Sequence, residues 1–148
     1  PNVEDFIEKA LLQRPEVIEA NEMAEVAKLN ADLALKYYAS NTYIYKKANL
    51  DAKKEELKTE DVKRQICLEV RKAYLFTLER AEKLKASQQA KKAAEETYRI
   101  ANLKYEAERV TMVEVLEAME RLRQAEKHYA SCVYDYNVSK AKLYNWVN

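Results

Sequence analysis

The sequence predicts an all-α protein made of elongated antiparallel helical hairpins that pack as a coiled-coil bundle. The 148 residues include no glycine and only two prolines, Pro1 and Pro15, whereas the tight turns of β-rich folds depend on such residues. Apolar residues recur in alternating steps of three and four, which is the heptad spacing of a left-handed coiled coil. Charged residues make up 34% of the chain, so its apolar surface should lie in stripes. We therefore expect a single helical domain over residues 1–148.

The first third of the chain predicts two helices. Residues 3–13 are amphipathic and end before Pro15, whose ring suits the first turn of the next helix. The helix predicted over residues 15–39 carries a heptad seam of mostly alanine, which lets helices approach closely. Its residues are Val17, Ala20, Ala24, Ala27, Ala31, Ala34 and Tyr38. A second apolar line lies beside this seam, formed by Ile18, Val26, Leu29, Leu33 and Tyr37. We therefore expect this helix to contact neighbours on two sides.

Residues 40–51 predict a connector, because their Ser, Asn, Thr and Asp side chains compete for backbone hydrogen bonds. The run Thr42-Tyr43-Ile44-Tyr45 favours extended structure. The connector is too short for two membrane-spanning barrel strands, each of which needs about 9 to 11 residues. The helical pattern resumes over residues 52–107, and a helix of that length depends on packing against partners for its stability. Residues 52–70 should pack on residues 15–39.

A helix start follows directly after residues 108–110. Thr111 can cap a new helix, and Glu114, three residues later, can reach back to complete a capping box. Val110 and Val115 stand at the positions of a hydrophobic staple. The chain should therefore reverse at 108–110 into an antiparallel helix over 111–147. The predicted seam of that helix comprises Met112, Leu116, Met119, Leu122, Glu126, Tyr129, Val133, Tyr136, Lys140, Leu143 and Val147.

Composition argues against several classes of function. With 26 basic and 25 acidic residues the net charge is +1, so no basic field is available for nucleic acid or a membrane surface. No apolar run is long enough to cross a bilayer. No basic-then-apolar pattern of a signal peptide is seen at the start of the sequence, and Pro1 in place of Met leaves open a processed or cut N-terminus that has lost an export signal. Triads, P-loops and dinucleotide-binding loops are absent. We therefore expect no enzymatic activity and no cofactor.

The two cysteines and the one histidine predict no metal site. Cys67 and Cys132 are too few and too far apart for a metal site or a disulfide framework, and small buried side chains are the simpler interpretation. The reversal places Cys132 opposite about residue 88, so no intrachain disulfide is expected. For His128 we expect a solvated helix position with no second ligand one turn away.

Four short sequence segments, together with the order of the predicted helices, resemble the motifs of a known protein family. They are Leu68-Glu69-Val70-Arg71-Lys72-Ala73-Tyr74, Tyr105-Glu106-Ala107-Glu108-Arg109-Val110-Thr111, Val115-Leu116-Glu117-Ala118 and Tyr134-Asp135-Tyr136-Asn137. In this order they resemble the C-terminal repeat of the TolC-like outer-membrane efflux proteins, and the resemblance covers nearly the whole chain.

The resemblance implies a passive conduit for export. Members of the family are trimers whose paired repeats form an α-helical tunnel in the periplasm and a β-barrel in the outer membrane. In efflux and type I secretion, a periplasmic adaptor couples the tunnel tip to an inner-membrane transporter. A chain with one repeat would form a trimer or a hexamer, six copies being needed for a tunnel of the family's size.

By the same resemblance, the tunnel tip or gate comprises Tyr105, Glu108, Arg109, Val110, Thr111, Glu114 and Glu117. Tyr105 matches a tyrosine that helps to hold the tunnel closed. Glu114 and Glu117 match acidic positions at the constriction, where rings of carboxylates favour cations. Each has an ordinary alternative: Tyr105 is also a seam residue, Glu114 a capping acid and Glu117 part of a solvated face.

The sequence departs from the family pattern at three points. The membrane hairpin is replaced by the residues around Thr42 to Tyr45. Glu108 stands where the tip usually has glycine, so the backbone there cannot adopt a left-handed conformation without cost, and Val110 stands where a gating arginine is common.

Two other classes of function remain open. A periplasmic helical-bundle scaffold or chaperone, with no transport activity, fits the same composition. A membrane-curving helical dimer is disfavoured by the neutral charge. Oligomeric state separates the classes, because tunnel components form trimers or hexamers around a wet lumen, whereas scaffolds form dimers or trimers with a dry interior.

Overall fold

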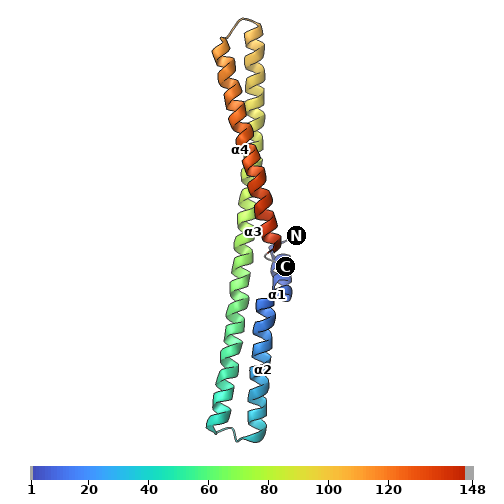
Figure 1. Ribbon diagram of the computed structural model, residues 1–148, viewed down its shortest axis with the longest axis vertical. Coiled ribbons are helices and arrows are strands. Elements are labelled where there is room, and N and C mark those ends of the chain that lie inside the picture. Colours follow the sequence, from blue (N-terminus) through green and yellow to red (C-terminus); the bar gives the residue numbers. More distant parts are fainter. Residues whose placement is uncertain (1, 146–148) are drawn as a thin grey trace. The chain divides into compact units, whose positions relative to one another are not determined.

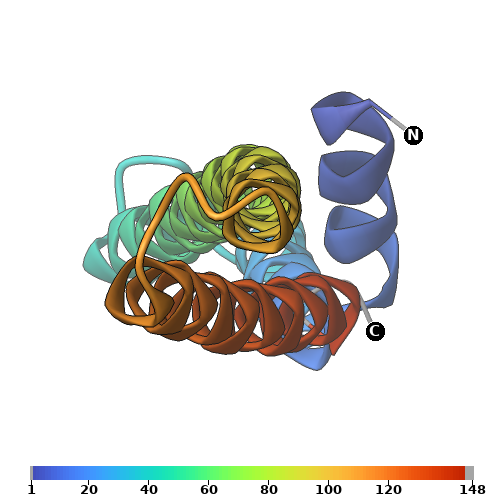
Figure 2. The same cartoon turned by 90° about the horizontal axis from the view of Figure 1, so that it is seen from above.

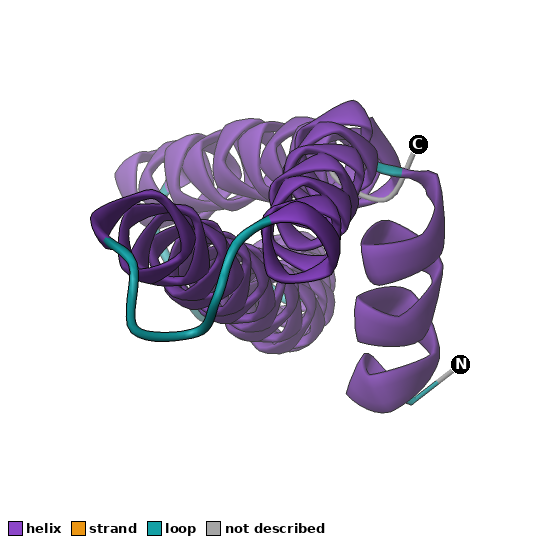
Figure 3. Cartoon of the chain, turned by 90° about the horizontal axis from the view of Figure 1, so that it is seen from below, coloured by secondary structure: helices purple, strands orange, loops and turns teal. Residues whose placement is uncertain are grey.

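The computed structural model describes residues 2–145, and this part of the chain contains helices and loops but no strand (Figures 1 and 3). The helices are α1 (Val3–Gln13), α2 (Pro15–Tyr37), α3 (Tyr43–Glu106) and α4 (Met112–Asn145). The predicted all-α class is confirmed. None of these helices is apolar over enough of its length to cross a bilayer.

The connector between α2 and α3 is shorter than the sequence predicted. Helix α2 ends at Tyr37 rather than residue 39, and α3 begins at Tyr43 rather than residue 52. Thr42 caps the new helix: its hydroxyl donates to the Ala39 carbonyl at 2.7 Å and accepts the amide hydrogen of Tyr45 at 3.4 Å. Thr42, which argued for a connector, therefore caps α3, and the residues from Tyr43 onward lie within the helix. Capping and packing there outweigh the low intrinsic helix propensity of polar and β-branched residues.

Helix α1 has the predicted bounds, and α4 begins one residue after the predicted position. Asn2 starts α1 with a capping box, in which its side chain and that of Asp5 each accept a backbone amide hydrogen of the other residue. The predicted end of the last helix, with the seam residue Val147, lies outside the described residues.

The chain divides into two compact units, and α3 contributes residues to both. The first unit holds the chain up to Tyr74 together with the residues from Leu143 onward, and the second unit spans Leu75–Lys142. In the first unit, α2 runs antiparallel to the beginning of α3, and in the second the end of α3 runs antiparallel to α4 (Figure 1). The predicted packing of residues 52–70 on α2 is confirmed by a hydrogen bond of 2.9 Å from the Thr59 hydroxyl to the Ala20 carbonyl.

The core of the first unit forms where α1, α2, α3 and the end of α4 meet. Its buried apolar residues are Phe6, Ala10, Val17, Ile66, Val70 and Leu143. Phe6 lies against two aromatic rings, with centroid distances of 6.3 Å to Tyr74 and 5.8 Å to Tyr144. Burial of a side chain of this size stabilises the fold by about 1.5–3 kcal/mol. The apolar face predicted for residues 3–13 therefore holds α1 on the helix pair.

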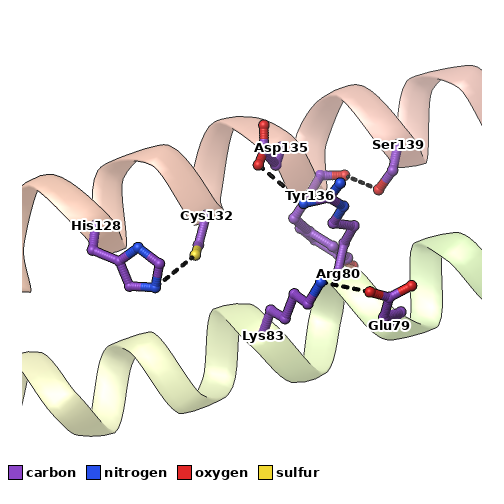
Figure 4. Close-up of polar contacts among 8 residues, drawn as sticks. All are labelled: Glu79, Arg80, Lys83, His128, Cys132, Asp135, Tyr136 and Ser139. Carbon is purple, nitrogen blue, oxygen red and sulfur yellow. Dashed lines mark hydrogen bonds and ion pairs between the residues drawn. The ribbon is translucent and has the colours of Figure 1, made fainter.

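The second unit is held together by small side chains. Ser87 and Ser139 are buried, and each hydroxyl donates within its own helix, to the carbonyl of Leu84 and of Tyr136 respectively, both at 2.8 Å. Figure 4 shows the second of these bonds. Hydroxyls satisfied in this way allow two helices to pack closely without an unpaired polar group.

The predicted seam of α4 is wrong in its first turns. Met112, Leu116 and Met119 are exposed, whereas Val115 and Ala118 are buried. Both lines have the same spacing and lie next to each other on the helix, so periodicity alone did not distinguish which of them faces α3.

Candidate functional site

The reversal between α3 and α4 gathers the predicted tip residues at one end of the second unit, where Figure 2 shows the connecting loop. The last turn of α3 closes with two hydrogen bonds, from the Glu108 amide to the Tyr105 carbonyl at 2.9 Å and from the Arg109 amide to the Lys104 carbonyl at 2.8 Å. This pairing is the Schellman motif, which requires a left-handed residue after the helix. Glu108 occupies that position with φ of 53°.

Glu108 thus adopts a left-handed conformation, which is costly for any residue other than glycine. For a residue with a β-carbon the left-handed region costs about 1–2 kcal/mol. The two hydrogen bonds of the motif satisfy carbonyls that the helix end would otherwise leave unpaired, and they offset this cost. The reversal is therefore tight although the sequence lacks the usual glycine.

The first turn of α4 is held by the carboxylate of Glu114. The amide and the hydroxyl of Thr111 both donate to Glu114 Oε1 at 3.5 Å, and the Glu114 amide donates to the Thr111 carbonyl at 3.1 Å. The acidic half of the predicted capping box is thus present. Val110 is half-buried and Val115 is buried, as the staple prediction requires.

Glu114 and Glu117 line an open groove between the ends of α3 and α4, together with two cations, Lys104 and Arg121. The remaining lining residues are Thr97, Ile100, Ala101, Val110 and Ala118. In one copy of the chain this groove therefore has mixed charge rather than a purely acidic lining.

Four of the predicted tip residues, Tyr105, Glu108, Arg109 and Thr111, are exposed at the reversal and do not line the groove. The structure therefore separates the predicted set into a groove and an exposed loop. Sequence reasoning missed Lys104 and Arg121, although Arg121 stands four residues after Glu117 and so on the same helix face.

Midway along the second unit, polar contacts join α3 to α4 (Figure 4). Arg80 Nη1 lies 3.2 Å from a carboxylate oxygen of Asp135, and its guanidinium lies 4.7 Å from the centre of the Phe76 ring. On the exposed side of α3, Lys83 donates to Glu79 at 2.5 Å, and this hydrogen bond lowers the pKa of the Glu79 carboxyl below its usual value. We assign the Arg80–Asp135 contact to the pairing of α3 with α4, whereas the Glu79–Lys83 pair lies within α3.

The prediction that His128 has no potential ligand one turn away is wrong, because Cys132 stands four residues later. His128 Nε2 lies 3.8 Å from Cys132 Sγ (Figure 4). His128 is exposed, as predicted, and Cys132 is buried in a groove that includes Ser87 and Ala90, which agrees with the expected level of residue 88. Cys67 and Cys132 are both free thiols, as predicted. Within residues 2–145, no three His, Cys, Asp or Glu side chains are grouped so as to hold a metal ion.

The described residues thus form long antiparallel helical hairpins that leave lines of apolar side chains exposed. The family model described as "Outer membrane efflux protein" matches residues 18–148. The chain therefore belongs to the outer membrane efflux protein family, as the four sequence segments indicated. Comparison with curated proteins and with solved structures found no significant match.

Proposed function

We propose that this chain is the periplasmic helical-tunnel component of an outer-membrane efflux or type I secretion channel. In this role it is a passive conduit that catalyses no reaction. It acts in the periplasm in association with the outer membrane, where a periplasmic adaptor couples it to an inner-membrane transporter. Family membership supports the proposal, and so does the fold of two antiparallel helix pairs.

The observation that carries the proposal is the apolar surface that the second unit leaves uncovered. Among its residues, 75–142, the buried apolar side chains are Val115, Ala118 and Cys132. Many larger apolar side chains are exposed: Leu75, Phe76, Leu78, Ile100, Leu103, Met112, Val113, Leu116, Met119 and Tyr134. Long helices draw their stability from packing, and exposed apolar surface of this extent marks an interaction site. In a tunnel wall, neighbouring hairpins on both sides would cover it.

The tip residues keep their proposed roles within this function. The exposed ring of Tyr105 would contact neighbouring tips, and the reversal formed by Glu108, Arg109, Val110 and Thr111 would meet the adaptor. The groove carboxylates Glu114 and Glu117 would face the constriction. Because Lys104 and Arg121 line the same groove, cation preference there depends on which of these charges the assembly leaves exposed to the lumen.

The proposal is tested by measuring the molar mass of the assembled protein and the shape of its cross-section. Light scattering over a range of concentrations should give a trimer or a hexamer, and small-angle X-ray scattering of that species should give a hollow, water-filled cross-section. A strict monomer at high concentration would contradict the proposal, because a closed tunnel needs several copies. An oligomer with a solid cross-section would also contradict it and would support the scaffold alternative.

A second experiment addresses the adaptor. A benzophenone-maleimide photo-cross-linker attached at Arg109→Cys, in a chain whose native cysteines are replaced by serine, should capture a purified periplasmic adaptor on irradiation. The same probe at Lys85→Cys, an exposed position away from the reversal, is the matched control. Equal capture at both positions would argue against docking at the tip.

A further inference from the structure

Helix α2 has an exposed face that is apolar along its centre and acidic around it. Its apolar residues are Ile18, Val26, Leu29, Leu33 and Tyr37, with exposed fractions of 44%, 59%, 59%, 44% and 72%. Its acidic residues Glu19, Glu22 and Glu25 are exposed. Two of them line one open groove with Met23 and Val26, and Glu55 and Lys58 of α3 lie at its edge, so carboxylates outnumber cations there. We call this surface the acidic face. Helix α2 as a whole carries five acidic residues and two lysines.

The first turns of α3 have an exposed face of the opposite charge. Its apolar residues Tyr43, Leu50 and Leu57 repeat every seven positions and are 79%, 67% and 56% exposed. The exposed lysines Lys46, Lys47, Lys53 and Lys54 surround them. The last two line a groove with Leu50, Leu57, Lys58 and Asp61, in which three lysines outnumber one carboxylate. We call this surface the basic face.

The two faces lie on opposite sides of the α2–α3 pair. At about 100° per residue, the acidic face is roughly on the far side of α2 from the buried Val17 and Ala31. The basic face is likewise on the far side of α3 from the buried Thr59, which contacts Ala20 on α2. One chain therefore cannot bring its own acidic and basic faces together.

We propose that the acidic face of one copy binds the basic face of a second copy, head to tail. This inference rests on the proposed function and names the surfaces that would join the tunnel components. The occupant is a second copy because each face supplies what the other lacks: an apolar centre and a rim of the opposite charge. A contact with two-fold symmetry would instead bring the acidic faces of two copies together, or their basic faces, so that like charges would face each other.

The register of the helix pair supports the match. The Thr59–Ala20 hydrogen bond shows that residues 59 and 20 lie at the same height along the helix pair. Because the two helices are antiparallel, a residue n positions after residue 20 on α2 lies at the height of the residue n positions before residue 59 on α3. Leu29 then lies at the level of Leu50, and Glu25 at the level of Lys54. In a second copy related by rotation about an axis parallel to the helices these levels are kept, so leucine would meet leucine and glutamate would meet lysine.

A heterologous contact of this kind continues from copy to copy until the rotation closes a ring. A nucleic acid or an anionic membrane would bind the basic face alone and would leave the acidic face without a partner. The apolar line on α2 that the sequence predicted to contact a neighbour is, in the structure, the centre of the acidic face.

Charge reversal tests the pairing. The first variant is Glu22→Lys with Glu25→Lys, which gives the acidic face a net positive charge, and the second is Lys53→Glu with Lys54→Glu, which neutralises the basic face and sets acid against acid at the level of Glu25. The control, Glu4→Lys with Glu8→Lys, changes exposed residues of α1 and shifts the net charge as the first variant does. Circular dichroism verifies the folding of each variant, and sedimentation measures its association constant.

Each reversed variant should associate at least about tenfold more weakly than the wild type, and the control should not, because facing charges of like sign disfavour the contact. The difference should shrink in about 0.5 M salt, where charges are screened within a few ångströms. An equimolar mixture of the two reversed variants should regain association. A single chain with all four face substitutions should also regain it, since opposite charges again face each other at the level of residues 25 and 54.

The outcomes separate this inference from the proposed function. A wild type that stays monomeric would refute both. If the wild type assembles but the reversed variants assemble equally well, the tunnel proposal stands and the pairing of these two faces is wrong. If the four-substitution chain behaves like either two-substitution variant, the contact is not head to tail, and the inference is overturned.

Discussion

Replacing Glu108 with glycine should stabilise the reversal between α3 and α4. Glu108 has φ of 53°, where the β-carbon of an L-residue crowds the following carbonyl. Glycine has no β-carbon and adopts this conformation freely. The hydrogen bonds made by the amides of Glu108 and Arg109 involve only backbone atoms and are therefore kept.

The magnitude follows from two opposing effects. Relief of the left-handed strain contributes about 1–2 kcal/mol, and the greater freedom of glycine in the unfolded chain removes about 0.5–1 kcal/mol. We therefore expect Glu108→Gly to raise the free energy of unfolding by about 0–1.5 kcal/mol. Glu108→Ala keeps the β-carbon, so the difference between the glycine and alanine variants isolates the backbone effect from the loss of the carboxylate.

Urea unfolding followed by circular dichroism, at one fixed protein concentration, measures the change in stability. Glu106→Gly is the matched control, because Glu106 is the last residue of α3 and glycine there should destabilise by about 0.5–1 kcal/mol. Native-state hydrogen exchange of the amides of Glu108 and Arg109 locates the effect. If Glu108→Gly is no more stable than Glu108→Ala, the left-handed assignment of residue 108 is refuted.

The remaining predictions concern a core residue, a cap and an ion pair. Val70→Ala removes a side chain with 0% exposure and should cost about 2 kcal/mol in urea unfolding, whereas Leu12→Ala, at an exposed site, should cost under about 0.5 kcal/mol. Thr111→Ala removes the hydroxyl that donates to the capping carboxylate and should cost about 0.5–1 kcal/mol, and an unchanged melting midpoint would mean that this hydroxyl does not stabilise α4. Lys83 lowers the pKa of Glu79 below its ordinary value of 4.5, so their ion pair stabilises the fold above that pH and ceases to do so as the pH falls through the lowered pKa. Thermal midpoints of the wild type and Glu79→Gln should therefore differ slightly at neutral pH and converge in acid, and a gap that widens in acid would contradict this assignment.

The candidate site was predictable wherever its signal is local. Thr111 and Glu114 are three residues apart, and a capping box needs nothing beyond that spacing, so the start of α4 was correct to within one residue. Local signals were not sufficient at Glu108. The lack of glycine predicted that a left-handed backbone there would be costly, but the two backbone hydrogen bonds that offset this cost depend on where α3 ends. The groove cations Lys104 and Arg121 come from different helices, and only the packing of α3 on α4 brings them to the same groove as Glu114 and Glu117.

By itself, the sequence determined the all-α class, the alanine part of the α2 seam, the place of the reversal and the family. The last predicted seam residue, Tyr38, is exposed and follows the end of α2. Each rests on composition, on the period of the helix or on residues that are neighbours in the chain. Tertiary structure alone decided that α3 begins at Tyr43, that Val115 and Ala118 rather than Met112 and Leu116 face inward, and that α3 is shared by two units. Two apolar lines with the same period are equivalent in an isolated helix. Only contact with a second helix makes one of them core and leaves the other exposed for a further partner.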